Sequence, residues 1–459
     1  MSQGHQKPVG KPAGHRAYRG LSGQVFQLAF LGLFQKVANG VPVHLYKIYN
    51  KLCPVTFFKP RSTQGPSGEA LKPSPYPCLS IYEPNLQTMP IVIYPIITFI
   101  VSLLCTWATM PQLLKFCHER GLYDTPNARK VHSNNIPRLG GVLFAPALVM
   151  GIEASIVAMN ITGDNLMPIG LSACLLFGAV FLVFCIGLVD DLVGMEAKIK
   201  FAIQLVASLC MPFCNLYINN LYGFCGIYEI PAIVGYPLTV FTSLLIINAI
   251  NLIDGIDGLA SGLSLMTLGI FTFIFLRMDN VPFTLLTTGL MGALTVFMRY
   301  NLFGNAERSR KTFMGDTGSL ILGFTFAYLC IKYAMFNPST MPSQPCPILV
   351  SYTLVLVPVF DLVRVAFERL IQGKGIFTPD KRHIHHLFLA AGFSMHQALA
   401  CILGLQLFYD VVNTVSFYGL RLSPTWVVLF DIISYALVCT LLKICRKQRG
   451  TDPQQTKAK

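Results

Sequence analysis

This sequence has little charge for its length. Only 12% of its 459 residues are Asp, Glu, Lys or Arg, whereas about a quarter is usual in soluble globular domains. Hydrophobic residues make up 53% of the chain, and the mean hydropathy is +0.56. These values exclude an ordinary soluble domain, and composition alone predicts a polytopic membrane protein.

The sequence also lacks the cysteine and histidine spacing of a zinc site. Most of its 14 cysteines lie singly inside apolar runs, as Cys105, Cys174, Cys185 and Cys401 do. No pair of cysteines has zinc-ligand spacing with histidines nearby. We therefore interpret the cysteines as packing residues and expect neither a zinc-bound fold nor a disulfide scaffold.

Long apolar runs, in contrast, are abundant from residue 91 onward. Eleven of them are long enough to cross a bilayer as helices. They cover residues 91–113, 140–160, 168–189, 200–218, 232–250, 258–277, 281–302, 317–336, 347–368, 396–418 and 424–443. The run at 200–218 is the weakest of these predictions, because it begins with Lys200 and contains Gln204. We predict an all-α, polytopic integral membrane protein with about 11 transmembrane helices and cytoplasmic active-site loops.

Acidic residues are scarce, with 21 Asp and Glu against 35 Lys and Arg. A net charge of +14 could indicate nucleic-acid binding, but in a membrane protein it more often marks basic cytoplasmic loops. If the C-terminal tail is cytoplasmic, the inner segments carry 22 Lys and Arg, and the outer loops carry only Arg277, Lys332 and Arg421. This distribution predicts a cytoplasmic C-terminus and no nucleic-acid partner.

The N-terminal segment does not fit this arrangement. Residues 1–88 carry the remaining ten Lys and Arg and are rich in Pro, Gly and Ser, yet an odd number of helices would place residue 90 outside. Three alternatives stay open: the segment is disordered, lies on the membrane surface, or is not native, since Met89 begins an apolar run like a true start. We divide the chain into this extension, a membrane-embedded domain at 89–445, and a basic cytoplasmic tail at 446–459.

Polar residues gather in the loops on the predicted cytoplasmic side. Five aspartates lie there at helix ends: Asp190, Asp191, Asp254, Asp257 and Asp316. Carboxylates so close together repel one another unless a cation or a proton intervenes. Single aspartates at helix ends are often only caps, but five on one face favour a site for Mg²⁺, for which Mn²⁺ can substitute.

Basic residues and glycines complement these carboxylates. Seven basic residues share the face, namely Arg129, Lys130, Lys198, Lys200, Arg308, Arg310 and Lys311. Most of them need only satisfy the positive-inside rule, but Lys200, at a helix entrance, is the better phosphate ligand. The stretches DGIDGLASG and GDTGSLILG lead into helices whose N-termini favour phosphate. The HIHH stretch at 383–386 suits a substrate diphosphate or sugar better than zinc, and a surface-loop cluster is the alternative.

Five motifs in this order resemble one enzyme superfamily. DTPNARKVHSNNIPRLGG, DDLVGMEAKIKF, NLIDGIDGLASG, FMGDTGS and DKRHIHH are similar to the polyprenyl-phosphate N-acetylhexosamine-1-phosphate transferases of glycosyltransferase family 4, over about residues 89–445. The basic insert NAERSRK between Asn301 and Asp316, and HIHH in place of a triple histidine, resemble the WecA/TagO/Rfe-like group more than the MraY group.

This resemblance implies a reaction and a location. A HexNAc-1-phosphate, with GlcNAc as the first candidate, would pass from a UDP-N-acetylhexosamine to undecaprenyl phosphate, giving undecaprenyl-diphospho-HexNAc and UMP. This is the first lipid-linked step of a cell-envelope polysaccharide such as O-antigen. The expected location is the bacterial cytoplasmic membrane, with membrane lipids as surroundings and a homodimer as an open question.

The resemblance also implies roles for residues. Asp316 would be the main magnesium ligand, and Asp190 and Asp191 would serve the metal or deprotonate the lipid phosphate. Asp254 and Asp257 are expected in the catalytic site, at its nucleotide end. The expected substrate ligands are Arg129, His132, Arg138, Lys200, Asn248, Asn251, Asn301, Phe313, His383, His385 and His386.

Three other interpretations remain open. An MraY-type phospho-MurNAc-pentapeptide transferase and a dolichol-using relative lie within the superfamily. A transporter would also contain intramembrane carboxylates, but transporters bind near the bilayer midplane and often contain internal repeats, whereas the polar residues here lie at one face. The sequence does not decide which amino sugar is used or which glycan is made.

Overall fold

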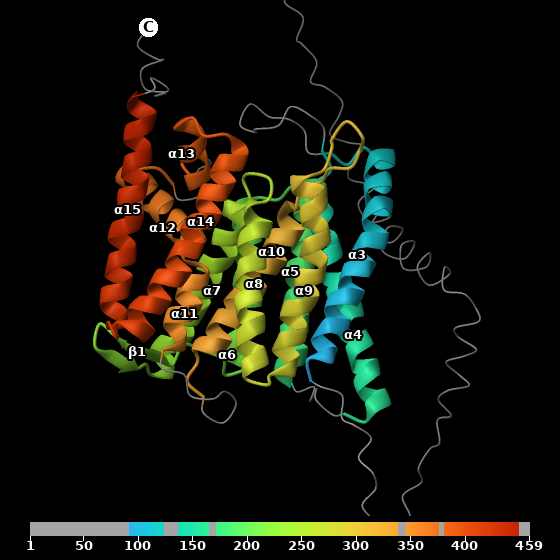
Figure 1. The fold of residues 1–459 in the computed structure, drawn as a ribbon, viewed down its shortest axis with the longest axis horizontal. Coiled ribbons are helices and arrows are strands. Elements are labelled where there is room, and N and C mark those ends of the chain that lie inside the picture. The colour runs from blue at the N-terminus through green and yellow to red at the C-terminus, as the bar shows by residue number, and fades with distance from the viewer. Residues whose placement is uncertain (1–90, 124–135, 165–170, 338–345, 376–380, 449–459) are drawn as a thin grey trace, which may run out of the picture. The chain divides into compact units, whose positions relative to one another are not determined.

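The computed structural model describes residues 91–123, 136–164, 171–337, 346–375 and 381–448, all within one compact unit, Tyr82–Lys459. The predictions for residues 1–88, for most of the C-terminal tail, and for Arg129 and His132 lie outside the described residues. The described part of the chain is a bundle of helices, and a two-stranded hairpin is its only sheet (Figure 1).

Thirteen α-helices follow one another along the described part of the chain. The α-helices are α3 (Ile93–Arg120), α4 (Phe144–Thr162), α5 (Leu171–Val193), α6 (Ala197–Phe213), α7 (Ala232–Ile253), α8 (Leu259–Arg277), α9 (Val281–Leu302), α10 (Gly315–Ala334), α11 (Pro347–Leu354), α12 (Leu356–Ile371), α13 (Ile384–Ala390), α14 (Met395–Thr414) and α15 (Pro424–Gln448). Two short helical turns, η1 (Gly140–Leu143) and the π-helical η2 (Val415–Gly419), adjoin α4 and α14.

Each of the eleven predicted apolar runs contains a helix. Nine helices of the described residues are long and apolar enough to cross a membrane, and α6, with 17 residues, is not among them. The run at 347–368 forms two helices, α11 and α12, which meet at a bend of 69° and would make a tenth span if counted together. The prediction of an all-α polytopic membrane protein is confirmed, while the number of spans stays a prediction.

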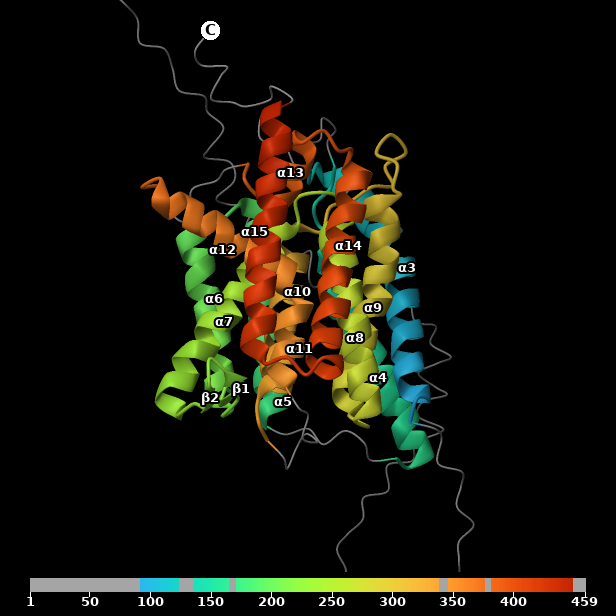
Figure 2. The same ribbon diagram turned by 60° about the vertical axis from the view of Figure 1, so that its left-hand side comes forward.

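A side chain of α14 stabilises the break between α11 and α12. Gln406 donates from Nε2 to the Thr353 carbonyl at 2.8 Å, and its Oε1 accepts from the Val357 backbone N–H at 3.2 Å. These backbone groups flank the break, and inside a membrane no water is present to bind them. Gln406 therefore provides hydrogen-bond partners for backbone groups on both sides of the bend. Figure 2 shows α12 extending sideways from the bundle.

The helix α10 is central, since 94% of an 18-residue apolar stretch of this helix is buried inside the protein. It packs against α5, α7 and α11. A Cβ atom on Gly323 would lie 2.8 Å from the Cα of Ile247 in α7, and one on Gly187 of α5 would lie 2.5 Å from the Cα of Thr317. These glycines allow close backbone approach, which brings the start of α10 against the ends of α5 and α7.

The two ends of the bundle differ. One end carries α13, and the other carries a hairpin of β1 (Asn220–Phe224) and β2 (Ile227–Glu229), which pair antiparallel (Figures 1 and 2). The apolar periodicity did not predict this hairpin. The polar residues discussed next lie at the end that carries α13.

Candidate active site

Four helices contribute side chains that meet at one ammonium group. Lys200, in the first turn of α6, forms an ion pair with Asp316 of α10, and its Nζ lies 3.0 Å from Oδ2 of Asp190 in α5. Asn251 of α7 completes the group, because its Nδ2 donates to Oδ1 of Asp316 at 2.6 Å and its Oδ1 lies 3.4 Å from Lys200 Nζ. The structure thus brings together the four residues that the sequence assigned to one site.

A tight connection between α5 and α6 produces part of this geometry. Oδ1 of Asp190 accepts from the backbone N–H of Met195 at 2.7 Å, while Gly194 has a positive φ of 77°. This turn folds α6 back beside α5 and directs Lys200 toward the Asp190 carboxylate. Because Asp190 and Asp316 are both acidic, the ammonium between them offsets a repulsion that burial would otherwise make severe.

Asp191 faces a different partner from its neighbour. Its Oδ1 accepts from the Asp316 backbone N–H at 2.8 Å, and its Oδ2 accepts from the Thr317 N–H at 2.9 Å and from the Thr317 hydroxyl at 2.6 Å. Asp191 therefore caps the N-terminus of α10 from another helix. Gly315 (φ +73°) permits this approach, since a Cβ there would lie 2.6 Å from Asp191 Oδ2.

This cap corrects one expectation from the sequence. The stretch GDTGSLILG was expected to offer free backbone N–H groups to a phosphate, but the N–H groups of Asp316 and Thr317 donate to Asp191 instead. The physical reason is that α10 begins directly against the end of α5, so a protein carboxylate fills the position that an anionic ligand would take.

Arg138 and Phe313 lie behind the carboxylates. The Arg138 guanidinium donates from Nε to the Asp191 carbonyl at 2.9 Å and from Nη2 to the Asp190 carbonyl at 3.4 Å. A cation at these carbonyls stabilises the C-terminal end of α5. The backbone N–H of Phe313 donates to the Pro137 carbonyl at 2.8 Å. Arg138 thus holds the segment 137–140 against the end of α5, and Phe313 holds it against the segment before α10.

The turn between α7 and α8 presents two carboxylates with different surroundings. Oδ2 of Asp257 lies 2.6 Å from Nζ of Lys311, which comes from the loop before α10. Asp254 accepts no hydrogen bond and forms no ion pair with the residues that the structure describes. Burial, together with the charges of Asp316, Asp257 and Asp191, raises the pKa of Asp254 to about 7. Asp254 is thus the carboxyl group left available for a ligand or a proton.

Two predicted asparagine ligands bind other parts of the protein. Asn301 accepts from the Gly258 N–H at 2.7 Å and donates to the Thr312 carbonyl at 3.0 Å, which ties the Asp254–Asp257 turn to the segment before α10. Asn248 donates to Oε1 of Gln204 at 2.8 Å. Because Asn248 precedes Asn251 by about one turn of α7, it lies deeper in the bundle and links α7 to α6.

The histidines of 383–386 reach the same turn from the other side. A Cβ on Gly255 would lie 2.1 Å from Nε2 of His385, so the imidazole rests directly against this glycine next to Asp254. Burial lowers the pKa of the His385 imidazole to about 3, with the neighbouring His386 adding to the effect. His385 is therefore neutral at pH 7. The sequence prediction that this cluster joins the aspartate site agrees with the contact.

Sequence reasoning missed the residue that holds this cluster in place. Asp361 of α12 is 1% exposed, and its Oδ2 lies 2.8 Å from Nδ1 of His383. Its Oδ1 accepts from the Ile384 N–H at 2.9 Å and from the Arg364 guanidinium at 2.6 Å. An Asp–x–x–Arg pair inside an apolar run was the available signal. Lys311 was also missed, because it was read as one of several positive-inside residues.

The donor set suits a hard divalent cation. Among the described residues, no three His, Cys, Asp or Glu side chains converge closely enough to form a metal site. Magnesium usually takes only one or two carboxylates and completes its shell with water and substrate phosphates. Asp190 and Asp316 both form ion pairs with the Lys200 ammonium. The two carboxylates therefore already stabilise a positive charge between them.

Comparison with known proteins shows the family to which this chain belongs. The family model of glycosyl transferase family 4 matches residues 173–334, a range that contains all five aspartates and Lys200. The probable undecaprenyl-phosphate N-acetylglucosaminyl 1-phosphate transferase of Bacillus subtilis (strain 168) is 31% identical over 345 residues, which cover 73% of this chain and 88% of the relative. The chain belongs to glycosyl transferase family 4.

Two further relatives match over a similar extent. The undecaprenyl-phosphate alpha-N-acetylglucosaminyl 1-phosphate transferase of Escherichia coli O157:H7 is 31% identical over 360 residues, covering 75% of this chain and 93% of the relative. The protein of the same name from Yersinia pestis is 31% identical over 314 residues, covering 67% and 80%. The family recognised from five motifs is confirmed.

Proposed function

We propose that this chain transfers HexNAc-1-phosphate, with GlcNAc-1-phosphate as the first candidate, from a UDP-N-acetylhexosamine to undecaprenyl phosphate. The products are undecaprenyl-diphospho-HexNAc and UMP. The observation that carries the proposal is the convergence of Asp190, Lys200 and Asp316 at one end of an apolar helical bundle. The names of the family members that match most of the chain support the same reaction.

The reaction requires two anions to approach each other. An oxygen of the lipid phosphate attacks the β-phosphorus of the nucleotide sugar, the bond from this phosphorus to the bridging oxygen breaks, and UMP leaves with that oxygen. Lys200 supplies a positive charge where the phosphates would meet, and preorganised charge of this kind stabilises a transition state. The membrane holds the lipid phosphate near the end of the bundle, which lowers the entropy cost of the encounter.

We assign Asp316 and Asp190 as the residues that would hold magnesium, or manganese in its place. When bound, the ion would offset the charge of the diphosphate and of the departing UMP. Asp191 would act indirectly, because both of its oxygens cap α10 and thereby fix the start of the helix that carries Asp316. Asp254, which has no protein partner among the described residues, would accept a proton or contact the nucleotide.

We further propose that the site faces the cytoplasm of a bacterial inner membrane. The distribution of 22 basic residues on one side and three on the other supports this orientation. A nucleotide sugar is made in the cytoplasm, so a site at this face would meet it directly.

The decisive experiment offers purified protein several UDP-sugars together with undecaprenyl phosphate and magnesium. We expect UMP release with UDP-GlcNAc, and a lipid product heavier by one HexNAc-phosphate group. UDP-MurNAc-pentapeptide as the sole active donor would favour the MraY-type alternative. Uptake of substrate into vesicles without any UMP release would favour a transporter and contradict the proposal.

A further inference from the structure

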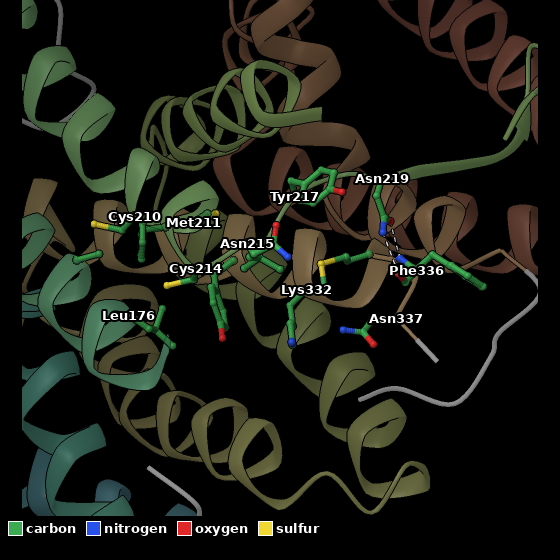
Figure 3. A pocket seen from close by; sticks show the side chains of 15 residues that line it. Leu176, Cys210, Met211, Cys214, Asn215, Tyr217, Asn219, Lys332, Phe336 and Asn337 are labelled. Atoms are coloured by element: carbon green, nitrogen blue, oxygen red, sulfur yellow. Dashed lines mark hydrogen bonds between the residues drawn. The ribbon is translucent and has the colours of Figure 1, made fainter. Parts of the chain in front are cut away.

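A cavity lies at the end of the bundle opposite the aspartates. It has a volume of about 440 Å³ and is lined by side chains of α5, α6 and α10 and of the segment 214–219 (Figure 3). Small-molecule sites commonly range from about 300 to 1,000 Å³. The walls are partly apolar, with Leu176, Met211 and Phe324 among the lining residues.

One charged side chain enters this cavity. Lys332 follows Asp316 by 16 residues in α10, so the two lie about 24 Å apart along the helix axis at 1.5 Å per residue. Because α10 is enclosed by other helices, Lys332 points into the cavity and not into the lipid (Figure 3). It has neither a hydrogen bond nor an ion pair with the residues that the structure describes. An ionisable group in this position indicates a functional site.

The other polar groups of the cavity favour an anion. Tyr328, one helical turn before Lys332, presents a hydroxyl group, and Asn215 keeps its amide NH₂ available because its Oδ1 accepts from Tyr236 at 3.0 Å. Asn219 closes the rim through two hydrogen bonds to the Phe336 backbone, at 2.8 and 2.7 Å. Among the described residues that line the cavity, none carries a carboxylate. Donors and one positive charge therefore surround the space.

The surroundings of the cavity favour a lipid as the source of that anion. Phe177 of α5 and Phe213 of α6 are next to the lining residues Leu176 and Cys214 and are 42% and 80% exposed. On a membrane-spanning bundle such apolar side chains meet acyl chains. The lining residues of α5 and α6 thus lie next to exposed apolar side chains, which in a membrane would contact lipid.

We propose that this cavity binds the phosphate head group of a membrane lipid from the leaflet opposite the candidate active site. Lys332 holds the phosphate, Tyr328 and Asn215 donate hydrogen bonds to it, and the apolar wall contacts the first methylenes of the chain. This site is separate from the transferase site, so its failure in experiment leaves the proposed reaction untouched.

The full-length protein contains its own probe of this cavity. Cys214 lines the cavity, whereas Cys225 is exposed in the hairpin turn at the same end of the bundle. Alkylation of each thiol by a small maleimide can be followed by site-resolved mass spectrometry in detergent. We expect dioctanoyl phosphatidic acid to slow the alkylation of Cys214 but not of Cys225, and we expect neither dioctanoylglycerol nor inorganic phosphate to do so.

Variants test the role of the charge. Lys332→Gln should raise the lipid concentration that half-protects Cys214 at least tenfold, because a charge-assisted hydrogen bond is lost. Lys332→Arg should stay within about threefold of the wild type, since it keeps the charge. Arg421→Gln, which removes a basic group outside the cavity lining, is the matched control and should have no effect.

Several outcomes would overturn the proposal. Equal protection by dioctanoylglycerol would mean that the phosphate is not recognised, and protection by inorganic phosphate would mean that the ligand is a soluble anion. An unchanged half-protecting concentration in Lys332→Gln would remove Lys332 from the site. If that variant does not fold, the comparison of the three probes on the wild-type protein still decides the matter.

Discussion

At the scale of single residues, charge compensation governs the candidate active site. Asp190 and Asp191 are adjacent in sequence, yet one faces Lys200 and the other caps α10. Asn248 and Asn251 share a face of α7, yet only Asn251 reaches Asp316. Residue type and spacing predicted that these groups belong to one region. The partner of each residue depends on its position along the helix axis and on the rotation of the helix, and the spacing in the sequence does not specify either relative to the neighbouring helices.

The first prediction concerns Lys200. Lys200→Gln removes the cation between two carboxylates and leaves their repulsion uncompensated, so kcat for transfer should fall by about 10²-fold or more. Lys198→Gln is the matched control, because Lys198 is exposed two residues earlier and should retain nearly full activity. Activity of Lys200→Gln close to that of the wild type would contradict the assigned role. UMP release under saturating substrates is the measurement.

The second prediction concerns Asp254 and pH. Because the pKa of Asp254 is raised to about 7, the fraction of ionised carboxylate increases as the pH rises from 6 to 8. If Asp254 accepts a proton, the transfer rate should rise about tenfold across this interval. Asp254→Asn should be slow and should lose that rise. Retention of the wild-type pH profile in Asp254→Asn would assign the titration to the substrate phosphate.

The third prediction concerns His385 and stability. Its pKa is about 3 in the folded protein and about 6.5 when solvated, so the unfolded state binds more protons between these values. The titration of His385 therefore leaves the free energy of unfolding unchanged above about pH 6.5, and lowers it progressively as the pH falls toward 3. Between pH 7 and pH 5 the loss should be about 2 kcal/mol. Unfolding in mild detergent measures this, and His385→Gln should remove that part of the pH dependence.

At the scale of elements, one buried carboxylate links α12 to α13. Asp361→Asn would leave the Arg364 guanidinium without its buried partner and remove two contacts to the start of α13. We expect a loss of about 3 kcal/mol in unfolding free energy, together with faster amide exchange in α13 than in α10. Hydrogen exchange followed by mass spectrometry measures both helices.

A second substitution separates burial from charge. Glu368 binds the same Arg364 at 2.9 Å, but its side chain is 23% exposed and also pairs with Lys443 near the surface. Glu368→Gln should therefore cost less than about 1 kcal/mol. Equal effects of the two substitutions on α13 would show that Asp361 does not anchor this helix specifically.

The helices were predictable from sequence because runs of about 20 apolar residues have few alternatives in a membrane. The break at Val355 was not, because it depends on Gln406, which is about 50 residues away in the chain. The hairpin at 220–229 was missed for a related reason. It is short and lies outside the apolar runs, where periodicity carries little information.

At the scale of the whole molecule, two exposed cysteines report orientation. Cys225 lies in the hairpin at one end, and Cys445 lies near the end of α15 at the other. With the proposed topology, a membrane-impermeant maleimide should label Cys225 in intact spheroplasts and label Cys445 only after permeabilisation. The opposite pattern would invert the topology and place the aspartates away from the cytoplasm. Site-resolved mass spectrometry distinguishes these cysteines from the others.

The enclosure of α10 has a mechanical consequence. In α10, 94% of an 18-residue apolar stretch is buried inside the protein, whereas in α15 only 28% of such a stretch is buried. Helices adapt to bilayers of different thickness mainly by tilting where they touch lipid. The outer helices can therefore tilt when the thickness of the bilayer changes. The central helix α10, and with it Asp316 in its first turn, keeps its position in the bundle.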